Sequence, residues 1–156
     1  MTVTIIGKDR LLRKMKALPP LADRLVRAAM EESADDIVRT MKSLAPVDSG
    51  DLQMSIKWTY GDAPKGSLKI AQIKSREGNV RITIFAGGGD AYYARMVEFG
   101  TKEHIAGGKF AGAKIPAIRA QPFFYVTFRA KRKSAKSRVS RAITKAAKQI
   151  AAGSGT

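Results

Sequence analysis

The feature that most constrains the fold is a long amphipathic stretch between two proline-containing segments. From Leu21 to Leu44, apolar residues recur mostly every three or four positions, a spacing that places them on one side of an α-helix. Pro19-Pro20 precedes this stretch and Ala45-Pro46 follows it. Residues 1–18 are expected to form a short strand or arm followed by a basic turn or helical piece. Because a prolyl ring disfavours helix in the residue before it, we expect this piece to end at Pro19-Pro20 and the long helix to stop at Ala45-Pro46.

Three stretches after this helix predict an antiparallel sheet. Residues 55–60 alternate apolar and polar side chains, and residues 68–75 and 80–86 predict a hairpin around Arg76-Glu77-Gly78-Asn79. The first hairpin strand breaks its alternation between Ile70 and Ile73, which predicts a bulge or a twist there. In the tight connection before residue 55, Asp48 or Ser49 is expected to cap a short turn.

A short helix and a long arm follow the sheet. We expect a helix over residues 91–99, capped by Asp90 and closed by Gly100. Its predicted buried side consists of Tyr92, Tyr93, Met96 and Val97. Residues 101–120 have no clear period, and a loop of this length inside a compact domain is often functional. We interpret it as an arm that orders on a neighbouring subunit, with subunit contacts through Ile105, Phe110 and Ile115.

The last element is a basic helix. Pro122 is expected to open it, and the strong strand preference of Phe123 to Phe128 predicts a strand or turn before helix begins at about Ala130. Residues 151–156 are expected to form a flexible tail. The sum is an α+β fold in one domain over residues 1–150: a long N-terminal helix, an antiparallel sheet of about four strands, a short helix and a basic C-terminal helix.

Charge is distributed very unevenly along the chain. The net charge is +16, every acidic residue lies at or before Glu103, and 12 Lys or Arg follow with no acid among them. Such polarity predicts a negative partner, which is nucleic acid, an acidic protein surface or anionic lipid; the alternative is a merely solubilising face. Contact with DNA or an acidic partner is predicted for nine residues: Arg129, Lys131, Arg132, Lys133, Lys136, Arg138, Arg141, Lys145 and Lys148.

The sequence offers little for catalysis. There is no cysteine, which excludes disulfides and Cys-based metal sites. The single histidine, His104, lies in the arm next to Glu103 without a further base or ligand in the pattern. Neither Gly87-Gly88-Gly89 nor Gly107-Gly108-Lys109 has the spacing of a phosphate-binding loop. We therefore expect no enzyme activity, no catalytic residue, no metal and no cofactor. No apolar run approaches a membrane span, so no membrane partner is expected.

Short motifs recur along the chain in a recognisable order. They are Ala45-Pro46-Val47-Asp48-Ser49-Gly50 with Leu52 after it, Tyr93-Ala94, Val97-Glu98-Phe99-Gly100-Thr101 and Ala120-Gln121-Pro122-Phe123. In this order and spacing they resemble the tail-component family of long-tailed phages of the lambdoid gene-ten type. The chain departs from the family pattern at Phe124-Tyr125-Val126-Thr127. The resemblance assigns ten residues as family motif residues with structural roles: Pro46, Asp48, Gly50, Leu52, Tyr93, Glu98, Phe99, Gly100, Pro122 and Phe123.

The resemblance implies a structural virion protein of the neck that completes or terminates the tail and joins it to the head. It implies a homo-oligomer, a ring of six around the DNA channel, with a head-completion or connector protein and the tail-tube protein as partners. Assembly would take place in the host cytoplasm. Structural roles are expected for the motif sites, with Asp48 and Gly50 shaping a turn and Glu98 pairing with a basic residue of the arm or of a neighbour. The alternative is a free basic protein that binds nucleic acid without sequence specificity.

Overall fold

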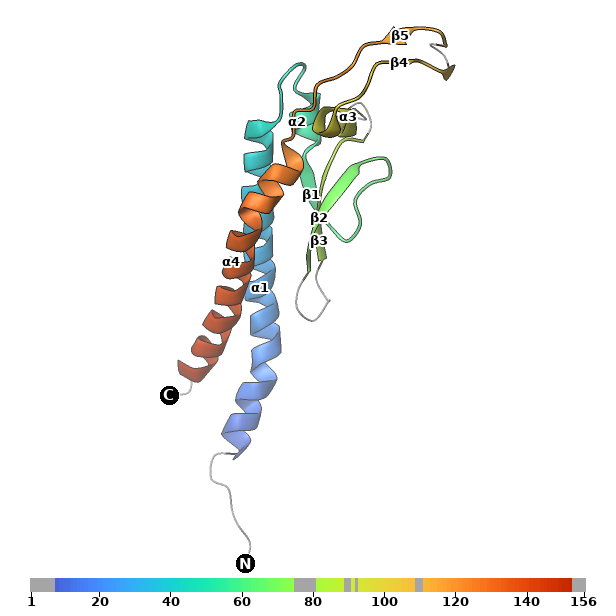
Figure 1. The fold of residues 1–156 in the computed structure, drawn as a ribbon. Coiled ribbons are helices and arrows are strands. Elements are labelled where there is room, and N and C mark those ends of the chain that lie inside the picture. Colours follow the sequence, from blue (N-terminus) through green and yellow to red (C-terminus); the bar gives the residue numbers. More distant parts are fainter. Residues whose placement is uncertain (1–7, 75–80, 89–90, 92, 109–110, 153–156) are drawn as a thin grey trace, which may run out of the picture. The chain divides into compact units, whose positions relative to one another are not determined.

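The predicted α+β fold is confirmed in the computed structural model, which describes residues 8–74, 81–88, 91, 93–108 and 111–152, with side chains described from Pro20 onward except over 70–74 (Figure 1). The elements, in chain order, are the long helix α1 (Lys8–Leu44), the short helix α2 (Asp51–Ser55), strands β1 (Lys57–Tyr60), β2 (Leu68–Lys74) and β3 (Arg81–Ala86), the short helix α3 (Ala94–Phe99), the short strands β4 (His104–Ile105) and β5 (Lys114–Ile115), and the basic helix α4 (Phe124–Ala152).

The chain forms two compact units. One is Ala34–Arg132, and the other combines Met1–Ser33 with Lys133–Thr156. The boundaries fall inside α1 and α4, so each long helix contributes to both units. That residues 1–150 form a single domain stays a prediction.

The Ala34–Arg132 unit contains an antiparallel sheet in the order β1-β3-β2. β3 is the central strand and pairs with β1 from Lys57 opposite Phe85 to Tyr60 opposite Ile82. The register of β2 against β3 shifts between Lys69 and Ala71, which confirms the predicted bulge in this strand. The predicted turn at residues 76–79 lies outside the described residues.

The core of this unit lies around β3. Ile82 and Ile84 of β3 are fully buried, as are Ile37 and Met41 of α1. Thr83 is also buried, and its hydroxyl donates a hydrogen bond to the Gly61 carbonyl. This bond matters because a buried hydroxyl without a partner is costly. Phe123 and Phe124, at the start of α4, are completely buried as well.

The second unit is an antiparallel pair of helix segments, the N-terminal part of α1 and the C-terminal part of α4 (Figure 1). Its buried residues include Val26, Ala29 and Met30 of α1 and Ala135 and Ala146 of α4. The small alanines allow two helices to approach closely. A polar contact joins the two segments, because Arg138 Nε lies 3.3 Å from Glu32 Oε1 and Arg138 Nη1 donates to Ser33 Oγ at 3.0 Å.

The expectation that a helical piece ends at Pro19-Pro20 was wrong. α1 begins at Lys8 and continues through both prolines to Leu44. Each proline removes one amide donor from the helix and therefore makes the helix less stable. Its fixed φ is compatible with a helical backbone, so the helix can continue through it. The predicted stop before Pro46 is confirmed. The expected strand or arm ahead of residue 8 lies outside the described residues.

Two other boundaries differ from expectation. α3 begins at Ala94 rather than at residue 91, and it buries Ala94 and Glu98 while Met96 is exposed. The predicted cap Asp90 lies outside the described residues, and Gly100 closes the helix as predicted. α4 begins at Phe124, not at about Ala130, so the strand or turn predicted for residues 123–128 was wrong.

Candidate functional site

The start of α4 is held by a buried carboxylate from α3. Glu98 is 3% exposed. Its Oε2 accepts hydrogen bonds from the amides of Phe123 at 2.8 Å and Phe124 at 3.0 Å, and its Oε1 accepts one from Tyr125 at 2.9 Å. The first amides of a helix have no partner within the helix, and a negative group there also interacts favourably with the helix dipole. Glu98 therefore acts as a cap for α4 that is supplied by another helix.

This contact corrects the expected role of Glu98, which was pairing with a basic residue of the arm or of a neighbouring subunit. Three amide donors satisfy the carboxylate instead. It also explains why residues 124–128 are helical despite their strand preference, because a tertiary cap outweighs local propensity. Pro122, which the sequence predicts to open this element, was the better guide to the helix start than the strand preference of the residues after it.

The residues around Glu98 form a junction with the segment before α4. The Gln121 amide donates to the Val97 carbonyl at 2.8 Å, and Thr101 and Ile118 exchange two backbone hydrogen bonds of 2.9 and 3.0 Å. Gly100 lies at the closest approach and has a φ of 72°. A Cβ atom built on Gly100 would lie 2.7 Å from the Ile118 carbonyl oxygen. The Val97–Thr101 motif is therefore the structural connection between α3, the arm and α4.

The other motif residues line one cavity. This cavity has a volume of about 360 Å³, and it is lined by Pro46, Val47, Asp48, Gly50, Leu52, Tyr93, Val97, Ile118, Arg119 and Gln121. Every motif segment contributes residues to this lining, although the segments lie apart in the sequence. Most of these side chains are apolar, and we call this space the motif cavity. Five of the predicted motif residues lie here, and the other five lie at or beside the Glu98 junction.

Gly50 and Ser49 shape the turn that forms one wall of the motif cavity. Gly50 has a φ of 89°, a left-handed value that favours glycine, and its carbonyl accepts the first hydrogen bond of α2 from Met54 at 3.0 Å. Of the two predicted caps, Ser49 is the one engaged, because its hydroxyl accepts from the Asp51 amide at 3.4 Å and donates to the Asp51 carboxylate. Asp48 remains exposed on the cavity lining.

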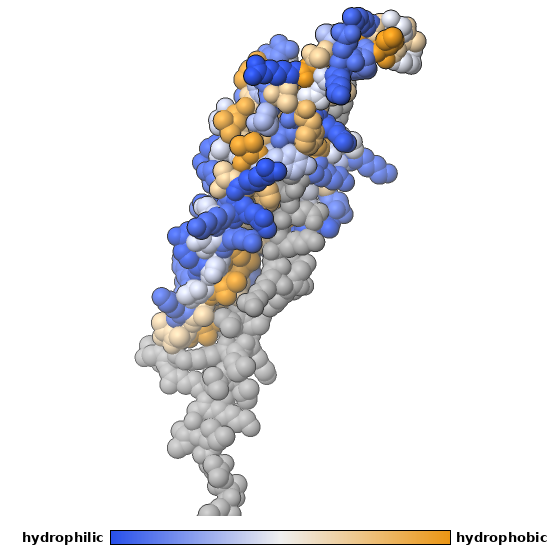
Figure 2. Space-filling model, in the orientation of Figure 1, coloured by the Kyte–Doolittle hydropathy of each residue, from blue (hydrophilic) through white to orange (hydrophobic). Residues whose placement is uncertain are grey.

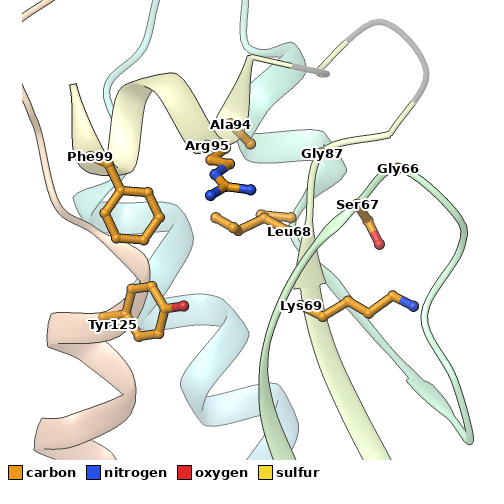
Figure 3. A pocket seen from close by; sticks show the side chains of 10 residues that line it. Gly66, Ser67, Leu68, Lys69, Gly87, Ala94, Arg95, Phe99 and Tyr125 are labelled. Atoms are coloured by element: carbon orange, nitrogen blue, oxygen red, sulfur yellow. The ribbon is translucent and has the colours of Figure 1, made fainter. Parts of the chain in front are cut away.

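A second cavity, of about 560 Å³, lies between the sheet and α3 (Figure 3). Phe99 and Tyr125 lie on one wall with their ring centroids 5.5 Å apart. Arg95 and Lys69 bring two cationic side chains to the lining. The Ser67 hydroxyl, also in the lining, donates to the Pro64 carbonyl at 2.6 Å. With these two cations, the described lining suits the binding of an anionic group. It does not suit nucleophilic catalysis by Ser67, because the described lining holds no base that could activate its hydroxyl.

The arm is a two-stranded hairpin. β4 and β5 pair from His104 opposite Ile115 to Ile105 opposite Lys114, and Lys114 Nζ lies 3.0 Å from Glu103 Oε1. Ile105 is 73% exposed, Ile115 is half-buried, and Phe110 lies outside the described residues. Apolar groups interrupt the hydrophilic surface of the arm (Figure 2). A hairpin of two short strands has little stability of its own.

The nine predicted contact cations of α4 divide into two groups. Lys131 and Arg138 have partners in the chain, Lys131 with Asp36 at 3.1 Å and Arg138 with Glu32 and Ser33. The other seven are exposed: Arg129, Arg132, Lys133, Lys136, Arg141, Lys145 and Lys148. The structure therefore assigns two of the nine to internal packing and leaves seven on the surface. Contact of these residues with DNA or an acidic partner stays a prediction.

Two further findings concern the described part of the chain. Across residues 8–152, apart from the gaps given above, no group of three or more His, Asp or Glu side chains could hold a metal ion. Within the same residues, no helix has both the length and the apolar composition needed to cross a bilayer. His104 lies in the arm, where its Nδ1 is 3.0 Å from the Lys102 carbonyl.

Comparison with known proteins gives a match to a protein family. Residues 9–100 match the family model described as "Bacteriophage HK97-gp10, putative tail-component". No curated protein and no solved structure matches the chain. The matched region covers more than half of the chain and includes the Pro46–Leu52 turn and the Glu98 and Gly100 side of the junction, which agrees with the resemblance inferred from the motifs. The chain therefore belongs to the HK97-gp10-like family of bacteriophage tail components.

Proposed function

We propose that this chain is a structural protein of the phage neck that completes or terminates the tail, joins it to the head and assembles as a ring around the DNA channel. In this proposal it acts without catalysis, and six copies form the ring. A head-completion or connector protein lies on one side of the ring and the tail-tube protein on the other. Membership of a tail-component family supports a location in the virion.

The observation that carries the proposal is the arm anchored at the motif junction. The Thr101–Ile118 bridge and the Gln121–Val97 hydrogen bond fix the base of the arm. Beyond this base, β4 and β5 present exposed side chains, including Ile105. A hydrogen-bonded base with a weakly stable extension that exposes apolar side chains suits a segment that orders on a neighbouring subunit, because binding then supplies the missing packing. Closed rings use such head-to-tail contacts between identical copies.

The test is cryo-electron microscopy of intact particles of the phage that encodes the chain. We expect a symmetric collar of this chain between the portal and the tail tube. Residues 129–148 lining the channel would make DNA the partner of the exposed cations on α4. Particles that lack the chain altogether would overturn the proposal.

A second candidate function is a free basic protein that binds nucleic acid without sequence specificity. The seven exposed cations of α4 favour it, since they suit contact with phosphates rather than with base edges. The variant Arg141→Gln/Lys145→Gln/Lys148→Gln separates the two candidates. Its matched control is Arg39→Gln/Lys57→Gln/Lys65→Gln, which removes the same charge from exposed sites outside α4.

For a free DNA-binding protein, the isolated chain should bind duplex DNA with a steep salt dependence. The α4 variant should then reduce the slope of log K against log salt concentration by about 2–3, because each phosphate contact contributes about 0.9. The control should leave the slope nearly unchanged. Equal effects of both variants would indicate only the general attraction of a cationic protein and would contradict this second candidate.

A further inference from the structure

We propose that the motif cavity is the docking site for the arm of a second copy of this chain, with Ile105 as the side chain that enters it. This inference rests on the proposed ring and names the receiving surface that the ring would use. The contact would be head-to-tail, because arm and cavity are different surfaces of the same chain. Each copy would then both donate an arm and receive one.

The motif cavity has the chemistry of a site for an aliphatic side chain. Val47 at its edge is 68% exposed and Ile118 is 39% exposed, so two aliphatic side chains are accessible to a partner there. Its volume of about 360 Å³ lies within the range of pockets that enclose a ligand group. Leu52 is buried and Gly50 fixes the turn, so this wall is formed before any partner arrives.

The arm has the complementary feature. Ile105 is the most exposed large apolar side chain among the described residues, at 73%. It projects from β4, which pairs only with β5 in the described part of the arm. The chain's own cavity does not receive it, since Ile105 is absent from the lining. A second copy carries the same exposed Ile105, so we assign its arm as the occupant of this cavity.

Charge favours the same pairing. Residues 101–118 contain three basic residues and one acid, whereas residues 46–52 of the cavity wall contain Asp48 and Asp51 and no base. Lys114 is already paired with Glu103, which leaves Lys102 exposed close to Ile105. Arg119 lies on the cavity lining, at the base of the chain's own arm. Opposite charges around an apolar contact fix its register and disfavour wrong partners.

Disulfide trapping tests this inference, because the chain has no cysteine of its own. Ile105→Cys supplies the donor and Val47→Cys the acceptor, and both positions are exposed, so neither substitution disturbs the core. The matched acceptor control is Lys65→Cys, an exposed loop position of the same unit. Full-length variants of different mass are produced together during infection, and the purified particles are oxidised.

We expect a covalent dimer with one Ile105→Cys chain and one Val47→Cys chain, at least tenfold more abundant than with Lys65→Cys. Neither variant alone should form it. Equal trapping with Lys65→Cys, an Ile105→Cys homodimer, or a covalent bond between Val47→Cys and a different protein would each overturn the docking inference. A collar present in the particles without the expected dimer would refute only the docking. Particles without the chain would refute the proposed function as well.

Discussion

At the scale of single residues, Glu98 decides where α4 begins. Its carboxylate is the acceptor for three backbone amides at the helix start, and it is buried. Gly100, two residues later, allows the backbone of the arm base to approach within a distance that no Cβ would permit. The motif residues of this segment therefore have a conformational reason to be a glutamate and a glycine, independent of any ligand.

Substitution of Glu98 should destabilise the fold. Glu98→Ala leaves buried amides without an acceptor and should lower the free energy of unfolding by about 2–4 kcal/mol. Glu98→Gln retains one acceptor oxygen and should cost less. Urea denaturation measures both. The control is Glu103→Gln, whose exposed pair with Lys114 should contribute about 0.5 kcal/mol or less. If Glu98→Ala costs no more than Glu103→Gln, the carboxylate is not the cap of α4.

Alanine substitutions at two glycines with similar φ values can distinguish the cost of a left-handed backbone from the cost of a steric overlap. Gly100 and Gly61 have φ values of 72° and 74°, but a Cβ on Gly61 would meet nothing within 4 Å. Gly61→Ala should cost about 1 kcal/mol for the left-handed conformation alone. Gly100→Ala should cost about 2–3 kcal/mol because the overlap with the Ile118 carbonyl adds to it. Chemical denaturation of both variants checks this, and equal costs would mean that the arm base is not packed closely against Gly100.

At the scale of elements, ion pairs connect side chains of the two long helices. The acids of α1 provide partners for cations that follow much later in the chain, as in the pairs Asp36–Lys131 and Glu32–Arg138. The absence of acids after Glu103 therefore does not leave every cation of α4 without a partner. The remaining surface cations distinguish α4 as a candidate contact element.

The Arg138 contact should stabilise the helix pair of its unit. Arg138→Met removes the interaction with Glu32 and Ser33 while retaining the aliphatic stem, and should lower the free energy of unfolding by about 1 kcal/mol. Lys136→Met, at an exposed position of the same helix, is the control and should change it by less than about 0.5 kcal/mol. Thermal and urea unfolding provide the comparison. A larger effect from Lys136→Met would contradict the assignment of Arg138 to packing.

At the scale of the whole molecule, the motifs, the arm and the basic helix all contribute to assembly in the proposed function. The turn at Gly50 and the junction at Glu98 bring the motif segments to one cavity and one arm base. The surface cations of α4 are available to a negative partner. The family match is to bacteriophage tail components, and the proposed assembly role agrees with it.

Deletion of residues 105–115 should leave the fold intact and abolish assembly. Residues 102–104 and 116–117 would still connect Thr101 to Ile118, so the bridge at the arm base can form. We expect an unfolding free energy close to that of the intact chain and, by electron microscopy, tails that fail to join heads. The control is Lys65→Ser in an exposed loop. Normal joined particles from the deletion would show that the arm is not a subunit contact.

The sequence by itself determined the features that are encoded locally. The helical period from Leu21 to Leu44 and its proline stop, the hairpin and its bulge, and the closure of α3 at Gly100 all follow from neighbouring residues, whose spacing sets which side faces the core. The motif order also indicated the family before any fold was known.

Only the tertiary structure decided the features that depend on distant residues. Glu98 caps amides 25 to 27 positions away, so the strand preference of residues 124–128 is overridden by a contact that no local pattern contains. The pair of Lys131 with Asp36 spans 95 positions. The motif cavity likewise exists only once its segments meet. Local propensities are worth tenths of a kcal/mol per residue, and buried hydrogen bonds to a charged group exceed them.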